Sequence, residues 1–243
     1  MLSIKSPKRA NLNERHQYFA FLILSLFALI LALIIYLKSP QILHRFIGDM
    51  HPLIVIFIII ILGFLPLPFL LSKTQFLIYQ KRNFKGLMIS AALASIFSIF
   101  VIIADFFLVY PADINITFPV SLIFYPAIGY FAEILFHLLS LSIVIFISTT
   151  LFRKSRNKKI IWISIIIVSF IEPIYQIIAM GVSNQYSLSI LVHTGLNVFL
   201  INLSQLIIFK YYDFISMYFF RLVYYLFWHI LWGYLRLEIL FQS

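Results

Sequence analysis

Long apolar stretches separated by short polar segments run through this chain of 243 residues. Each stretch is about as long as the roughly 20 residues that a helix needs to cross the hydrocarbon core of a bilayer. Apolar and polar residues do not alternate one by one within them, as they do in the strands of a transmembrane barrel. The pattern predicts an all-α, polytopic transmembrane helical bundle of about seven spans. These spans are expected at Tyr18–Leu37, Leu53–Leu71, Gly86–Tyr110, Val120–Leu151, Ile160–Met180, Leu188–Phe209 and Phe214–Leu235.

The fourth predicted span is longer than a bilayer requires. At 1.5 Å per residue it measures about 48 Å, against about 30 Å of hydrocarbon. Pro126 and Gly129 are natural points for a kink. We therefore expect a tilted or broken helix, with a re-entrant start.

Composition excludes several classes of protein. A mean hydropathy of +1.05 is far above that of a soluble domain. The absence of cysteine excludes disulfides, thiol catalysis and thiolate metal sites. The net charge of +10 does not indicate a nucleic-acid partner, because the basic residues lie in short loops between apolar spans. The lipid bilayer is the expected environment.

The loop charges predict an orientation. Cytoplasmic loops of membrane proteins carry an excess of Lys and Arg. Such residues fall before the first span and after the second, fourth and sixth spans: Lys5, Lys8, Arg9, Arg15, Lys73, Lys81, Arg82, Lys85, Arg153, Lys154, Arg156, Lys158, Lys159 and Lys210. The N-terminus is thus expected inside and the C-terminus outside, in the cytoplasmic membrane of a bacterium or archaeon.

Four expected regions follow from these spans. They are a cytoplasmic basic tail (1–17), helices one to three (18–117), a core of helices four to seven (118–235) and a C-terminal tail (236–243). The triplet that begins at Asn115 fits a glycosylation acceptor on the outer side.

Polar residues at helical spacing are concentrated in the last four spans. Ionisable groups inside a bilayer usually face the protein interior, a partner or a water-filled cavity. Residues four apart share one helix face. The pairs or series are Glu133 and His137, Glu172 and Gln176, His193 and Asn197 followed by Asn202 and Gln205, and Arg221, Tyr225 and His229. The remaining carboxylate, Asp105 in the third span, receives no role.

Each of these groups also has a purely structural interpretation. Glu133 and His137 fit an ion pair that joins helices. Glu172 fits a salt bridge to Arg221. His193 and Asn197 fit interhelical hydrogen bonds, and His229 fits an interfacial aromatic belt.

The segment Ala132-Glu133-Ile134-Leu135-Phe136-His137 resembles the first motif of the CAAX-processing and bacteriocin-processing (CPBP, or Abi) family of intramembrane glutamic proteases. That motif has two glutamates and, after three further residues, an arginine. Here Ala132 replaces the first glutamate and His137 replaces the arginine. The second motif, Phe followed after three residues by His, is closest to Phe170 through Ile174, with Glu172 as the polar group. The third, His followed after three residues by Asn or Asp, matches His193 and Asn197 in letters, whereas spacing favours Arg221 and Tyr225.

The resemblance covers roughly residues 118–230 and implies a divergent intramembrane endopeptidase. In the family, a glutamate activates water, and histidine and asparagine stabilise the oxyanion. The resemblance thus implies a membrane-bound or lipidated peptide as substrate and no cofactor or metal. The implied catalytic set is Glu133, His137, Glu172, His193 and Asn197. On this hypothesis Glu133 and His193 converge around water.

Three other functions fit the same residues. One is a catalytically inactive relative that acts as a scaffold. Another is a transporter in which the intramembrane charges relay protons. The third is a metal-dependent membrane hydrolase, whose ligands would come from Glu133, His137, Glu172, His193 and His229.

Overall fold

The structure is a computed structural model that describes residues 14–152, 158–182 and 186–241. Within these ranges it is helical, with connecting turns and no strand. Seven helices are long and apolar enough to cross a membrane, which confirms the predicted bundle. They are Glu14–Lys38, Pro52–Lys73, Phe84–Leu108, Ser121–Leu151, Lys158–Val182, Leu188–Tyr211 and Phe214–Phe241. The protein is therefore an integral membrane protein.

The spans contain shorter elements with distinct geometry. In chain order the elements are α1 (Glu14–Lys38), α2 (Pro40–Ile47), α3 (Pro52–Phe64), α4 (Leu67–Lys73), α5 (Phe84–Leu108), η1 (Ala112–Ile114), α6 (Ser121–Ala132), η2 (Glu133–Leu139), α7 (Ser140–Phe152), α8 (Lys158–Ser169), α9 (Ile171–Val182), α10 (Leu188–Tyr211), α11 (Phe214–Tyr225), η3 (Leu226–Trp232) and α12 (Gly233–Phe241).

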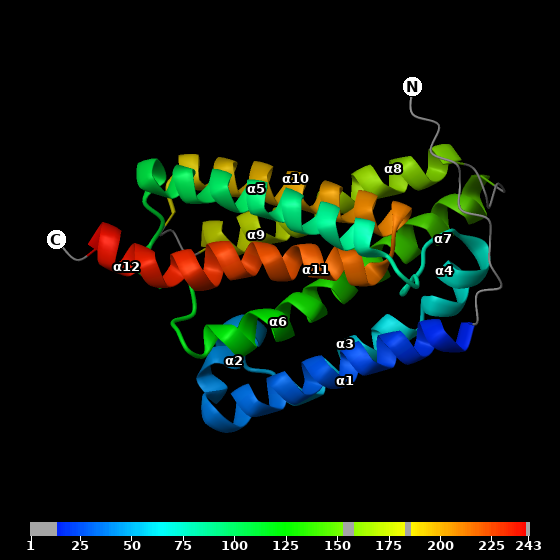
Figure 1. The fold of residues 1–243 in the computed structure, drawn as a ribbon, viewed down its shortest axis with the longest axis horizontal. Helices are drawn as coiled ribbons and strands as arrows, with labels where there is room; N and C mark the ends of the chain where they lie inside the picture. The colour runs from blue at the N-terminus through cyan, green and yellow to red at the C-terminus, as the bar shows by residue number, and fades with distance from the viewer. Residues whose placement is uncertain (1–13, 153–157, 183–185, 242–243) are drawn as a thin grey trace.

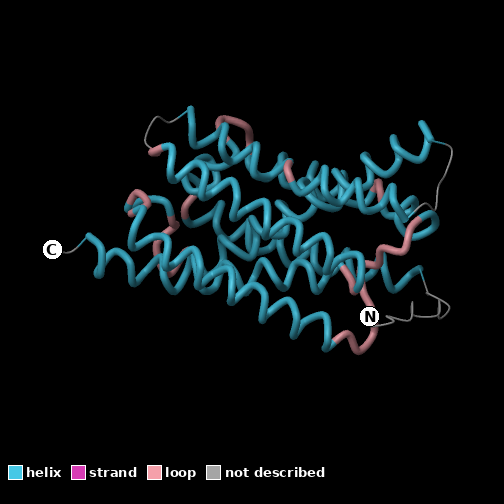
Figure 2. Tube along the Cα trace, turned by 90° about the horizontal axis from the view of Figure 1, so that it is seen from above, coloured by secondary structure: helices cyan, strands magenta, loops and turns pink. Residues whose placement is uncertain are grey.

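The long helices run roughly parallel or antiparallel to one another (Figures 1 and 2). Helices α1 and α3 lie on one side of the bundle and α5 and α10 on the other, with α6 and α11 between them (Figure 1). Direct packing of α6 against α1 and α11, and of α11 against α5 and α10, gives the same order. Helices α6 and α11 are therefore the central elements, and their inward faces are shielded from lipid.

The fourth span departs from the predicted break. Helix α6 continues through Pro126 without interruption, and the Tyr218 hydroxyl donates to the Pro126 carbonyl at 2.7 Å. The irregularity lies farther along, where Glu133–Leu139 forms a π-helix. Such wide turns are rare and occur often at functional positions. A second π-helix, η3, lies in the last span.

The fifth span is interrupted at one residue for a local reason. Pro173 has no backbone N–H, and its ring clashes with the carbonyl of the residue four positions earlier, Ser169. Helix α8 ends at Ser169, and α9 begins at Ile171. Glu172 consequently lies in the first turn of α9, where its side chain is buried.

The last span extends beyond the predicted end at Leu235. Helix α12 continues to Phe241, and Arg236, expected in a C-terminal tail, is fully buried. The start of α1 and the end of α12 lie at opposite ends of the bundle (Figure 1), as an odd number of spans requires. Several charges behind the predicted orientation lie outside the described residues: Lys5, Lys8, Arg9, Arg153, Lys154 and Arg156. The inside and outside assignment stays a prediction.

Candidate functional site

Glu133 and His137 form the start of a buried polar network in the middle of the fourth span. Both side chains are fully buried, and His137 Nδ1 lies 2.6 Å from Glu133 Oε2. The two residues belong to the π-helix η2, where they share a face. The two residues therefore pair within one helix, and neither side chain is exposed.

Arg221 joins this pair to Glu172. Its Nε donates to Glu133 Oε1 at 2.5 Å, and its two terminal nitrogens donate to the two oxygens of Glu172 at 2.9 and 2.8 Å. Paired, two-pronged contact of this kind is the strongest arrangement that a guanidinium makes with a carboxylate. The predicted salt bridge between Glu172 and Arg221 is confirmed, and Arg221 also pairs with Glu133.

Gln176, Gln205 and Tyr225 complete the network. We call the whole network the ion cluster; its members are Glu133, His137, Glu172, Gln176, Gln205, Arg221 and Tyr225. Gln205 donates through Nε2 to Glu133 Oε1 and accepts from Arg221 Nη2 at 3.3 Å. Arg221 Nη1 also donates to the Tyr225 hydroxyl at 3.1 Å. Gln176 Nε2 donates to Glu172 Oε1 at 3.2 Å.

Gln205 was noted as a polar residue of the sixth span but was not included in the implied catalytic set. It is uncharged, and Asn202, three positions earlier, does not bond to the cluster in the structure. The available signal was a fully polar amide inside an apolar span, which is costly unless it finds a partner. That signal does not indicate which partner.

His193 and Asn197 take partners outside the ion cluster. His193 Nδ1 lies 2.7 Å from the Tyr110 hydroxyl, and Asn197 Nδ2 donates to the Tyr224 hydroxyl at 3.2 Å. The Asn197 bond joins α10 to α11, as the structural interpretation expected, and the His193 contact joins α10 to the segment that follows α5. Of the five implied catalytic residues, the structure thus joins Glu133, His137 and Glu172 and places His193 and Asn197 in separate contacts.

Tyr110 follows the third span, at the end of the bundle where α10 begins. Its hydroxyl also lies 3.2 Å from Thr194 Oγ1. Burial raises the pKa of Tyr110 above its usual value near 10, and the hydrogen bond with Thr194 only partly opposes this rise. Tyr110 therefore stays neutral at physiological pH and can donate its proton to the His193 ring.

His229 is part of an aromatic cluster with Tyr125, Tyr224, Tyr225 and Trp228. The predicted interfacial position of this cluster stays a prediction. Its ring stacks on Tyr125 with a centroid separation of 4.5 Å. Its Nδ1 lies 2.6 Å from Asn115 Oδ1. Asn115 is only 6 % exposed, so the proposed glycosylation acceptor is wrong for the folded protein: a glycan needs an accessible amide nitrogen.

A second buried ion pair, absent from the sequence predictions, joins the third and seventh spans. Arg236 donates to both oxygens of Asp105, at 2.7 and 2.9 Å, and both side chains are fully buried. Trp232 Nε1 also donates to Asp105 at 2.7 Å. Asp105 received no predicted role, and its partner Arg236 lies 131 positions away in the sequence.

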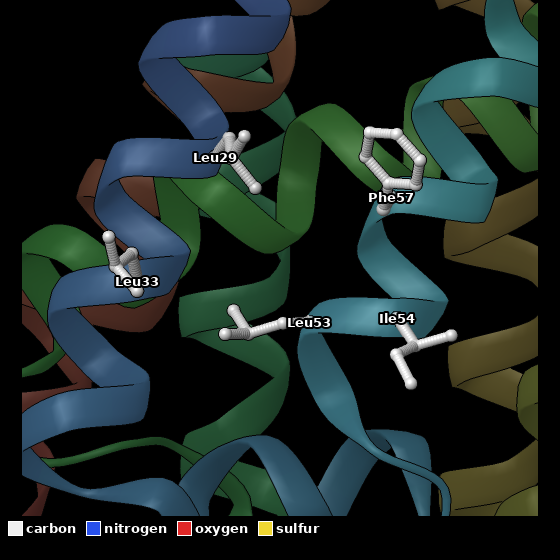
Figure 3. Close-up of a pocket in the computed structure, with 5 residues that line it drawn as sticks. All are labelled: Leu29, Leu33, Leu53, Ile54 and Phe57. Carbon is white, nitrogen blue, oxygen red and sulfur yellow. The ribbon is translucent and has the colours of Figure 1, made fainter.

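An apolar groove of about 410 Å³ lies on the lipid-facing side, away from the ion cluster. Figure 3 shows its lining residues from α1 and α3: Leu29, Leu33, Leu53, Ile54 and Phe57. It offers no side chain capable of acid–base chemistry. The groove is an apolar surface feature and not a reaction site.

Among the described residues, no three side chains of His, Cys, Asp or Glu are grouped closely enough to hold a metal ion. The five ligands considered for a metal site are divided between the ion cluster and the contacts of His193 and His229. Comparison with protein-family models, curated proteins and solved structures found no match.

Proposed function

We propose that this protein is a non-hydrolytic relative of the CPBP family that acts as a membrane-embedded scaffold. Three of the positions on which the resemblance rests support the relationship. Glu133, Glu172 and Arg221 lie on three different spans, in the segments compared with the three motifs, and Arg221 bonds to both glutamates. Arg221, and not His193, then takes the third-motif position.

The state of Glu133 supports the absence of hydrolysis. A general base must be within hydrogen-bond reach of the water that it activates. Glu133 is 0 % exposed, its Oε1 accepts from Arg221 and Gln205, and its Oε2 is bonded to His137. Its carboxylate is thus committed to protein donors.

Arg221 offers no substitute for an oxyanion hole. Peptide hydrolysis needs donors aimed at the oxygen where charge develops. A guanidinium has five N–H donors. Arg221 makes five hydrogen bonds, to the acceptors Glu133, Glu172, Tyr225 and Gln205. No donor remains for a reaction intermediate.

The ion cluster instead supports a structural function. Its members come from η2, α9, α10 and α11, so a single network connects the last four spans. Breaking a buried ion pair by removing one partner costs about 3–5 kcal/mol. The single observation that carries the proposal is this complete saturation of Arg221 between two buried carboxylates.

The test compares Glu133→Gln with Glu238→Gln, a control at an exposed carboxylate of α12. Cells that produce the wild type, either variant or no protein are compared for new peptide termini in the membrane fraction. A scaffold leaves these termini unchanged in all four. Unfolding in detergent should separate the variants, since losing a hydrogen bond to a charged partner costs about 1.5–3 kcal/mol in Glu133→Gln.

Proteolysis would give a different pattern. Termini that appear with the wild type and with Glu238→Gln, but disappear with a folded Glu133→Gln protein, would overturn the proposal and restore Glu133 as a catalytic base. Retention of the folded state is checked by the elution profile of the purified variant on gel filtration.

A further inference from the structure

Four buried side-chain atoms in or near the ion cluster have no hydrogen-bond partner within the described part of the chain. They are His137 Nε2, Ser164 Oγ and both amide atoms of Asn202. The exposed fractions of these residues are 0, 0 and 1 %. An unsatisfied buried polar group is costly, and in native proteins it usually bonds to protein or to ordered water.

The packing of the helices brings these residues to one region. Helix α8, which carries Ser164, packs against both η2 and α10. The bond from Gln205 to Glu133 joins α10 to η2. Asn202 lies three positions before Gln205, on the same face of α10. The three helices therefore enclose a common interior.

Two side-chain contacts fix the register of the fifth span against α10. The ring of Phe170 stacks on Phe199 at 4.3 Å, and Lys210 Nζ lies 3.3 Å from the centre of the Trp162 ring. The two helices are thus antiparallel, and Ser164 is level with the turn of α10 that follows Gln205.

The fourth span gives the matching level for His137. Gln205 is level with Glu133, to which it bonds. His137 lies one turn beyond Glu133, in the direction in which α10 also runs. His137 and Ser164 are consequently at about the same depth, on helices that pack together.

We propose that His137 Nε2 and Ser164 Oγ bind internal water between η2, α8 and α10. Asn202 lies on the opposite side of Gln205 along α10 and is not part of this site. Buried water typically makes two to four hydrogen bonds to otherwise unsatisfied polar groups, and His137 and Ser164 supply two such atoms at about the same depth. The water would complete the coordination of the His137 ring, whose other nitrogen is bonded to Glu133. This water is also a hydrogen-bond donor and acceptor for the ion cluster that is not a protein side chain.

The first test uses the sign of a stability change. Ser164→Ala removes a hydroxyl that either holds water for His137 or has no partner at all. In the first case the folded-to-unfolded ratio falls, by roughly five- to tenfold. In the second case the ratio rises, because an unsatisfied group has been removed, and the proposal is wrong.

Ser90→Ala is the matched control. Ser90 is also 0 % exposed, but its hydroxyl donates to the Gly86 carbonyl at 2.8 Å within its own helix. This change reports the effect of deleting a satisfied buried hydroxyl. If Ser164 holds water, Ser164→Ala should lower the folded-to-unfolded ratio about as much as Ser90→Ala does; a ratio that rises for Ser164→Ala while it falls for Ser90→Ala overturns the proposal.

A second measurement detects the water directly and does not depend on stability. The protein is labelled with ¹⁵N histidine in lipid, and polarisation transfer from water protons to the rings is recorded by solid-state NMR. His137→Gln identifies the His137 signal. We expect transfer to His137 that is lost in Ser164→Ala; absence of transfer in the wild type overturns the proposal.

Discussion

Replacing Arg221 by Met tests the role of the ion cluster most severely. The change removes five hydrogen bonds and the positive charge between two buried carboxylates. Glu133 keeps its contacts with Gln205 and His137, whereas Glu172 keeps only that with Gln176. Loss of one partner from a buried ion pair costs about 3–5 kcal/mol. That corresponds to a roughly hundred- to several-thousand-fold fall in the folded-to-unfolded ratio.

The assay is reversible unfolding in mixed micelles, followed by intrinsic tryptophan fluorescence. Arg15→Met, at an exposed position of α1, controls for the loss of a charged side chain. Adding Glu133→Gln and Glu172→Gln to Arg221→Met should recover part of the loss, because no unpaired charge then remains buried. If Arg221→Met lies within about 0.5 kcal/mol of the Arg15→Met control, a range typical of surface substitutions, the reasoning is refuted.

Two further predictions concern packing and pH. A Cβ added at Gly63 would lie 2.6 Å from Phe21 and 3.0 Å from Ile134, whereas one added at Gly181 meets nothing within 4 Å. Gly63→Ala should therefore destabilise the protein by about 1–3 kcal/mol, while Gly181→Ala should be neutral or stabilising; equal unfolding midpoints for the two variants would contradict this. The raised pKa of Tyr110 means that its contribution to stability is complete below its usual pKa near 10 and is lost as the pH rises further, since the unfolded state releases the proton first. Tyr110→Phe should thus show a smaller loss of stability than the wild type between neutral pH and about pH 11, and an unchanged alkaline slope of the unfolding midpoint would argue against it.

The membrane spans and some of the polar contacts of this chain could be predicted from its sequence. Seven apolar runs of membrane-spanning length predict seven spans, and the described residues form seven helices of that length. The spacing of Glu133 and His137 predicts their bond, because residues four apart share a helix face. The salt bridge of Glu172 with Arg221 was also foreseen, since buried charges need opposite partners.

Other contacts depend on how the helices pack and could not be read from spacing. The resemblance to a protease motif grouped Glu133 with His193. In the structure His193 contacts Tyr110, whereas Glu133 bonds to Gln205 and Arg221. The Pro126 position suggested a break, yet the wide turn begins at Glu133.

The sequence by itself determined that the protein lies in a lipid bilayer, how many spans it has and which polar residues need partners. The length of an apolar run and the presence of a charge within it are local properties. Only the tertiary structure decided which partners they found. Asp105 and Arg236 show why: each is costly in a bilayer when alone, but nothing local relates two positions so far apart in the chain. Helix rotation and depth fix such pairs, and both arise from the packing of all spans together.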